Sequence, residues 1–81
     1  MRLDKYLKNS RIIKRRTVAK EASEGGRVTV NGKVAKASTE VAVGDILEIQ
    51  FGDKVFKAEV THVAEHVTKD IAKEMFRIIE G

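Results

Sequence analysis

Apolar residues recur at helical intervals in two stretches near the start of the chain. In residues 3–11 the apolar positions are Leu3, Tyr6 and Leu7, and in residues 15–23 they are Val18, Ala19 and Ala22. An apolar face with this period predicts one amphipathic helix in each stretch. Gly25-Gly26 should end the second helix, because glycine adopts the left-handed conformation that closes a helix C-terminus at little steric cost. We therefore expect two short helices that pack together through small side chains.

After these glycines the apolar period shortens to two, which is typical of strands. Val28 and Val30 alternate with polar residues and precede Asn31-Gly32, a pair that favours the type I′ turn of a hairpin. A second turn is expected at Gly44-Asp45. Residues 47–51 and 56–60 alternate in the same way on either side of a turn at positions 52–53. The middle of the chain should thus be a small, largely antiparallel sheet.

The last part of the chain returns to a longer period. Thr68 stands where a helix N-cap is expected, and the apolar face that follows consists of Ile71, Ala72, Met75 and Ile79. A closing helix is predicted there, with residues 76–79 open to an extended conformation instead. The expected fold is α+β, with two short N-terminal helices packed on a small, largely antiparallel sheet and a C-terminal helix. Residues 1–63 should form one domain and residues 64–81 a helical extension.

Length and composition limit the classes of protein. The chain has 81 residues, of which 42% are hydrophobic and none is Cys or Pro. This predicts one small globular domain, with too little core for a large enzyme cleft. The lack of cysteine excludes disulfides, thiolate metal sites and a thiol nucleophile, and no apolar run is long enough for a membrane span or signal peptide. We expect a cytoplasmic monomer that is not an enzyme and needs no cofactor.

Charge is distributed unevenly along the chain. Residues 1–36 carry 11 basic and three acidic side chains, whereas residues 37–81 carry five basic and nine acidic ones. A positive field over one part of a small molecule attracts a polyanion. An anionic membrane would respond to the same field, but the basic half has no Trp or Phe with which a helix could enter a membrane surface. The predicted partner is a nucleic acid.

Most of these basic side chains should share one exposed surface of the two helices. Arg16 and Lys20 are four residues apart, and so are adjacent on one helix face. Seven bases against one acid in residues 2–16 is too one-sided for a face charged only for solubility. Arginine suits phosphate because its planar fork donates hydrogen bonds in pairs, whereas lysine acts as a point charge. The predicted phosphate-binding residues are Arg2, Lys8, Arg11, Lys14, Arg15, Arg16 and Lys20.

Asp4 is the one acid within this surface. It stands in the first turn of the first helix, where the helix dipole favours an anion, and Lys8 follows one turn later as an ion-pair partner. Alternatively, Asp4 orients a neighbouring arginine or accepts a hydrogen bond from a base or a ribose hydroxyl. The two roles are compatible, and the sequence leaves both open.

Other chemistry receives less support. His62 to His66 match the H-x-x-E-H pattern of inverted zinc peptidases, but the preceding residues alternate as a strand and no third ligand is identifiable, so we predict no metal site. Three Phe and one Tyr, mostly core residues, argue against base stacking as the main source of affinity. Recognition of phosphates and of the shape of folded RNA is favoured. A small regulator that binds duplex DNA stays open, although the second helix offers few Asn or Gln side chains to read bases.

Several motifs in order resemble the S4-type RNA-binding domain over roughly residues 1–51. They are Arg2–Leu7 (RLDKYL), Lys14–Thr17 (KRRT), Gly26–Lys33 (GRVTVNGK) and Val43–Asp45 (VGD). The opening RLDKYLK, the run KRRTVAKE and a match continuing over residues 72–79 resemble, in addition, the RqcP family of stand-alone bacterial ribosome quality control factors.

This resemblance implies a function and a set of contacts. Members of the family bind ribosomal RNA and peptidyl-tRNA on an obstructed large ribosomal subunit and help the factor RqcH to add a C-terminal alanine tail to the stalled chain. A heat-shock-type factor that recycles large subunits without tailing is the alternative among related proteins. The RNA contacts that the resemblance implies are Arg2, Asp4 and Arg16 as the principal ones, with Lys8, Arg11, Lys14 and Arg15 in support.

Overall fold

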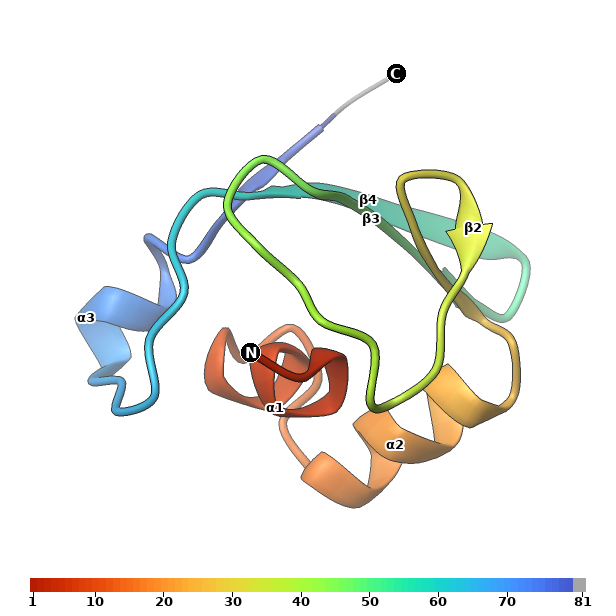
Figure 1. Cartoon of the computed structure of the whole chain (residues 1–81), viewed down its shortest axis with the longest axis horizontal. Coiled ribbons are helices and arrows are strands. Elements are labelled where there is room, and N and C mark those ends of the chain that lie inside the picture. The colour runs from red at the N-terminus through yellow and green to blue at the C-terminus, as the bar shows by residue number, and fades with distance from the viewer. Residues whose placement is uncertain (80–81) are drawn as a thin grey trace.

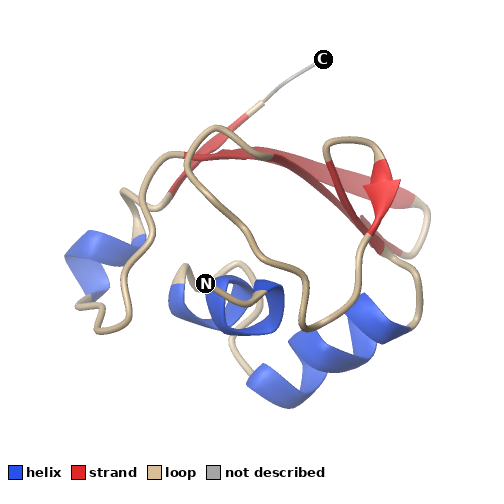
Figure 2. Ribbon diagram, in the orientation of Figure 1, coloured by secondary structure: helices blue, strands red, loops and turns tan. Residues whose placement is uncertain are grey.

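The computed structural model describes residues 1–79, which form three helices and one five-stranded sheet (Figures 1 and 2). The helices are α1 (Leu3–Asn9), α2 (Arg16–Glu24) and α3 (Lys69–Ala72). The strands are β1 (Val28–Val30), β2 (Lys33–Val34), β3 (Ile46–Phe51), β4 (Lys54–Val60) and β5 (Phe76–Ile78). Their order is β2-β1-β3-β4-β5, and all neighbours are antiparallel. This architecture confirms the predicted α+β fold class.

One face of the sheet is apolar and the other is polar. Because side chains alternate along a strand, Leu47 and Glu48 of β3 lie on opposite faces. On the polar face Lys57 Nζ lies 3.5 Å from a carboxylate oxygen of Glu48, and a guanidinium nitrogen of Arg77 lies 2.6 Å from one of Glu59. Helices α1 and α2 lie on the apolar side of the sheet (Figure 2). The hydrophobic core is therefore a single layer between helices and sheet.

The predicted hairpin turn forms between β1 and β2. Asn31 and Gly32 have φ angles of 53° and 84°, the positive values that a type I′ turn requires. The Asn31 side chain also accepts a hydrogen bond from the Ile46 amide at 2.9 Å and donates one to the Asp45 carboxylate at 3.1 Å. Asn31 thereby fixes the start of β3 as well as the turn.

Helix α1 occupies the centre of the core. Leu3, Tyr6 and Leu7 are fully buried, as their spacing predicts. The Tyr6 hydroxyl donates a hydrogen bond to the Met75 carbonyl, and burial raises the pKa of Tyr6 far above its ordinary value. Since Met75 immediately precedes β5, this bond ties the C-terminal segment to α1.

Helix α2 packs through small side chains. Ala19 and Ala22 are buried, and the Ser23 hydroxyl donates a hydrogen bond of 2.8 Å to the Ala19 carbonyl. Val18 is 45% exposed, however, so its predicted place in the packed stripe is wrong. Ile13, from the loop before α2, is buried in the core.

Both N-terminal helices end in a residue with left-handed backbone. After α2 that residue is Gly26, with φ 76°, and the amides of Gly26 and Arg27 donate to the carbonyls of the last helical turn. After α1 it is Arg11, with φ 63°, whose amide donates to the Lys8 carbonyl at 3.0 Å. Helix α1 thus ends at Asn9, two residues before the predicted end. An arginine stands where glycine would be the unstrained choice.

The C-terminal segment is helical only over α3. The Thr68 hydroxyl caps this helix by accepting the Ile71 amide at 3.3 Å, as predicted. Residues 76–78 then form β5, which pairs with β4, so the extended alternative holds for them and the predicted helix over residues 64–81 is confined to one turn. Pairing with β5 gives the backbone groups along the β4 edge hydrogen-bond partners, which they would lack if residues 76–78 were helical. Residues 80 and 81 of the predicted extension lie outside the described part of the chain.

Candidate nucleic-acid interface

The Asp4 carboxylate joins the two N-terminal helices. Its side chain is 3% exposed, and its two oxygens lie 3.2 Å from Arg2 Nε and 3.5 Å from Arg16 Nε. The Lys5 amide donates a third interaction, a hydrogen bond of 2.8 Å. Arg2 precedes α1 and Arg16 begins α2, so one buried anion holds a basic side chain from each of two segments.

The two arginines remain accessible although Asp4 is buried. The side chains of Arg2 and Arg16 are 48% and 54% exposed. A guanidinium has five N–H donors, and one carboxylate engages only some of them. The remaining donors of both arginines are available to a ligand. We call these residues the Asp4 clamp, consisting of Arg2, Asp4 and Arg16.

The clamp shows which side chains Asp4 pairs with in the free protein. Among residues 1–79, the ion pairs of Asp4 are with Arg2 and Arg16, so the expected pairing with Lys8 is wrong. The orientation of neighbouring arginines is what the geometry provides. No direct contact of Asp4 with a ligand is required, since its side chain is almost completely covered.

A second basic group lies where α1 leads into the following loop. Lys8, Arg11 and Lys14 line a hollow of about 350 Å³. All three are exposed, and none of them forms an ion pair with another residue of the range 1–79. The left-handed backbone of Arg11 costs roughly 1–2 kcal/mol for a residue with a Cβ atom. Arg11 therefore keeps an unfavourable backbone conformation while its side chain is exposed to solvent.

The remaining predicted residues extend these groups along α2. Arg15 immediately precedes the helix and Lys20 lies one turn after Arg16. Both are exposed and form no ion pair within the described residues. Exposed acids lie farther along the same helix, at Glu21 and Glu24. The basic surface therefore belongs to α1, the loop after it and the first half of α2.

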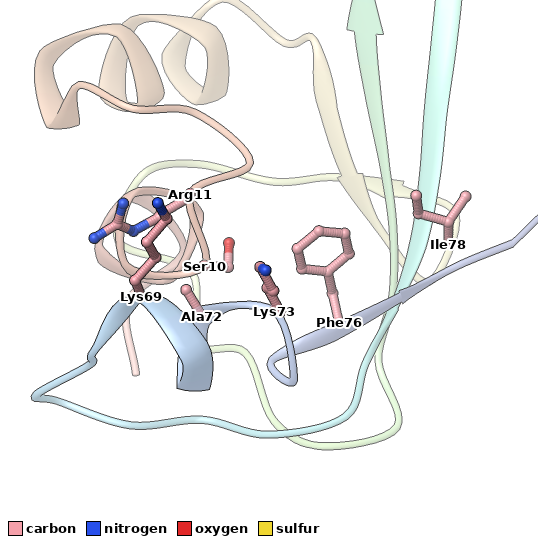
Figure 3. Close-up of a pocket in the computed structure, with 7 residues that line it drawn as sticks. All are labelled: Ser10, Arg11, Lys69, Ala72, Lys73, Phe76 and Ile78. Atoms are coloured by element: carbon pink, nitrogen blue, oxygen red, sulfur yellow. The ribbon is translucent and has the colours of Figure 1, made fainter.

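Three basic residues that were not among the predicted phosphate-binding residues differ in their surroundings. Lys5 forms an ion pair with Glu65, and this lysine lowers the pKa of that carboxyl. Lys69 and Lys73 come from the acidic half of the chain, yet they line one hollow together with Arg11 (Figure 3). The four-residue spacing of these lysines was the available signal, but nothing local indicates that α3 lies beside the end of α1.

The zinc-peptidase pattern has no structural counterpart. His62 and His66 are exposed and lie in an irregular segment between β4 and α3, so they do not share a helix face. Across residues 1–79, no cluster of three His, Asp or Glu side chains is arranged to hold a metal ion. Within the same range, every helix is too short or too polar to cross a bilayer.

Comparison with known proteins assigns the family. The S4 domain model matches residues 1–47. A "RQC P-site tRNA stabilizing factor" of Halalkalibacterium halodurans is 56% identical over 78 residues, which are 96% of this chain and 89% of that protein. The factor of the same name from Listeria monocytogenes is 55% identical over 80 residues, covering 99% of this chain and 87% of its own.

A solved structure supports the same assignment. Heat Shock Protein 15 of Vibrio cholerae, described as trimeric, superposes with a TM-score of 0.88 at 29% identity, over 98% of this chain and 81% of its own. Its likeness extends through the C-terminal segment, beyond the residues that the domain model matches. The chain therefore belongs to the S4 domain family, in which it groups with the bacterial RQC P-site tRNA stabilizing factors.

Proposed function

We propose that this chain is a non-catalytic RNA-binding factor of ribosome quality control. It binds ribosomal RNA and peptidyl-tRNA on an obstructed large ribosomal subunit in the cytoplasm. There it supports the addition of C-terminal alanine tails to stalled nascent chains by RqcH. The names of the relatives support the tRNA-binding role. The observation that carries the proposal is the Asp4 clamp, in which two half-exposed arginines are held by one buried carboxylate.

The clamp favours a phosphate-rich ligand through preorganisation. A long side chain that becomes ordered on binding costs about 0.5–1.5 kcal/mol. Asp4 orders Arg2 and Arg16 in advance, so this cost is met in folding rather than in binding. The clamped guanidinium groups act as the principal contacts and Asp4 as a positioning residue. The supporting contacts are Lys8, Arg11, Lys14, Arg15 and Lys20.

The contribution to tailing is positional. Holding a peptidyl-tRNA in one place makes the reaction of its acyl end effectively unimolecular, which raises the effective concentration of the reacting groups. The chain supplies no reacting side chain in this scheme. A single copy is sufficient, and we propose that it acts as a monomer.

A recycling factor of the heat-shock type is the second candidate. It is favoured by the fold shared with Heat Shock Protein 15, whereas the much higher sequence identity with the stabilizing factors favours the first. Deletion of the gene distinguishes the two. Loss of alanine tails, measured by mass spectrometry of stalled products, supports the tailing role, and persistence of tails with accumulation of blocked subunits supports recycling.

The RNA contact is tested with the Arg16→Ala variant. Sedimentation with large subunits that carry peptidyl-tRNA measures the bound fraction. We expect weaker binding with an unchanged melting temperature, because the side chain is 54% exposed and its one ion pair within residues 1–79 is long, at 3.5 Å. Lys54→Ala, at the first residue of β4, is the matched control and should bind normally. Equal binding of Arg16→Ala and Lys54→Ala would remove Arg16 from the interface, and preferential binding to duplex DNA would favour the regulator.

A further inference from the structure

A hollow of about 480 Å³ lies between the end of α1, helix α3 and strand β5 (Figure 3). Ala72, Phe76 and Ile78 supply its apolar part. Basic side chains also line it: Arg11 from the end of α1, and Lys69 and Lys73 from α3 and the residue that follows it. In Figure 3 the Phe76 ring projects into the space between β5 and these basic residues.

The apolar part of the hollow is a portion of the inner sheet face that α1, α2 and α3 leave uncovered. In the strand register Phe76 is opposite Val60 and Ile78 is opposite Ala58, and both of these β4 residues are fully buried. Ile78 is nevertheless 58% exposed. Helix α3 has only four residues, so it ends before reaching this position. The apolar face of the sheet is therefore exposed to solvent at its β5 edge.

The charge around the hollow selects an anionic ligand. Among residues 1–79, the ionisable residues that line it are Arg11, Lys69 and Lys73, and all are cationic. The acids of the same segment, Asp70 and Glu74, are not among the lining residues. A ligand that fits must combine an apolar surface for Phe76 with a negative charge for the three cations.

The hollow is continuous with the proposed RNA surface through Arg11. This residue lines both the present hollow and the one shared with Lys8 and Lys14. An RNA strand held by Lys8, Arg11 and Lys14 would therefore contact a residue that also lines this hollow.

We propose that this hollow binds one unpaired nucleotide of the RNA held by the helices, with the base against Phe76 and the phosphate among Arg11, Lys69 and Lys73. The inference rests on the proposed function and adds to it a preference for RNA with a displaced base. Aromatic side chains stack with every base, so the site tolerates any sequence. A paired base is excluded because its faces are covered by its neighbours in the helix.

The test compares two RNA hairpins that differ in one nucleotide. The first carries a single bulged 2-aminopurine in its stem, and the second has the same stem without the bulge. The wild-type protein should bind the bulged hairpin about 5- to 150-fold more tightly, the range expected for one stacked base. Fluorescence of the 2-aminopurine should fall on binding, because stacking on an aromatic ring quenches it.

Two variants assign the preference to the hollow. Phe76→Leu removes the aromatic ring but keeps the apolar volume that packs against Phe56, which lies 5.9 Å from Phe76 between ring centres. Lys73→Gln removes one exposed cation and leaves the core intact. Both should lose most of the preference for the bulge while binding the plain stem as before. Lys54→Gln is the control and should keep the full preference.

The outcomes separate this site from the function on which it rests. Equal wild-type affinity for the two hairpins overturns the nucleotide site and leaves the proposed function standing. A preference that survives in both Phe76→Leu and Lys73→Gln also overturns it. An acidic peptide that restores the 2-aminopurine fluorescence while the stem stays bound, and that fails to bind Phe76→Leu, would assign the hollow to a protein partner instead. If the wild-type protein binds neither hairpin and does not bind large subunits, both the proposed function and the nucleotide site are overturned.

Discussion

The Asp4→Asn substitution distinguishes oriented charge from charge alone. It makes the protein more positive by one unit, and simple attraction to a polyanion would then strengthen RNA binding. The clamp predicts the opposite result. Asn keeps an oxygen that can accept the Lys5 amide, but it no longer attracts the guanidinium groups 3.2 and 3.5 Å away.

The expected loss follows from the two side chains that the carboxylate orders. At about 0.5–1.5 kcal/mol for each side chain that must be ordered on binding, releasing Arg2 and Arg16 costs about 1–3 kcal/mol of binding free energy. This corresponds to a decrease in affinity of roughly 5- to 150-fold. The change in folding stability should be smaller, because neutralising a buried carboxylate also removes its desolvation penalty.

Fluorescence anisotropy with a labelled RNA hairpin at constant ionic strength measures the effect. Glu24→Gln is the matched control, since it also adds one positive unit on α2 but removes an exposed acid that forms no ion pair within residues 1–79. We expect Glu24→Gln to bind as tightly as the wild type or slightly more so. If Asp4→Asn also bound more tightly, the clamp would have no role in recognition.

Three further results are expected. If four to six phosphates are engaged, a plot of the logarithm of RNA affinity against the logarithm of salt concentration should fall with a slope of roughly 3 to 5. A flat response in this salt titration would contradict the electrostatic account. Leu7→Ala should cost about 2–5 kcal/mol of unfolding free energy, because Leu7 is fully buried, and should lower the melting temperature by several degrees at least; an unchanged melt would place Leu7 outside the core. Arg11→Gly should leave the stability unchanged or raise it by up to about 1 kcal/mol in chemical denaturation, since glycine accepts a positive φ, while RNA binding weakens. A destabilised variant with normal RNA binding would mean that Arg11 is kept for structural reasons.

The fold was largely predictable because local rules apply to most of its elements. Apolar spacing located α1 and α2, and Asn31-Gly32 located the hairpin, since a type I′ turn depends on two residues alone. The C-terminal segment was less predictable. An apolar spacing such as that of Ile71, Ala72 and Met75 indicates which face of an element is buried, but it does not show whether an open strand edge will pair with the next residues.

The candidate site was predicted as a set of residues but not as an arrangement. The charge count along residues 2–16 identified the basic surface, because like charges near in sequence stay near in space. Two features depended on tertiary contacts instead. The link from Asp4 to Arg16 requires the packing of α1 against α2, and the approach of Lys69 to Arg11 requires the C-terminal segment to fold back on α1.

The ion pairs on the outer face of the sheet have a consequence for how the molecule meets its partner. Glu48 with Lys57 and Glu59 with Arg77 leave that face with balanced charge, while the opposite layer carries the excess of cations. We expect this asymmetry to orient the protein in the field of a polyanion before any contact forms. Encounters should then begin with the two N-terminal helices facing the polyanion, which raises the fraction of collisions that lead to binding.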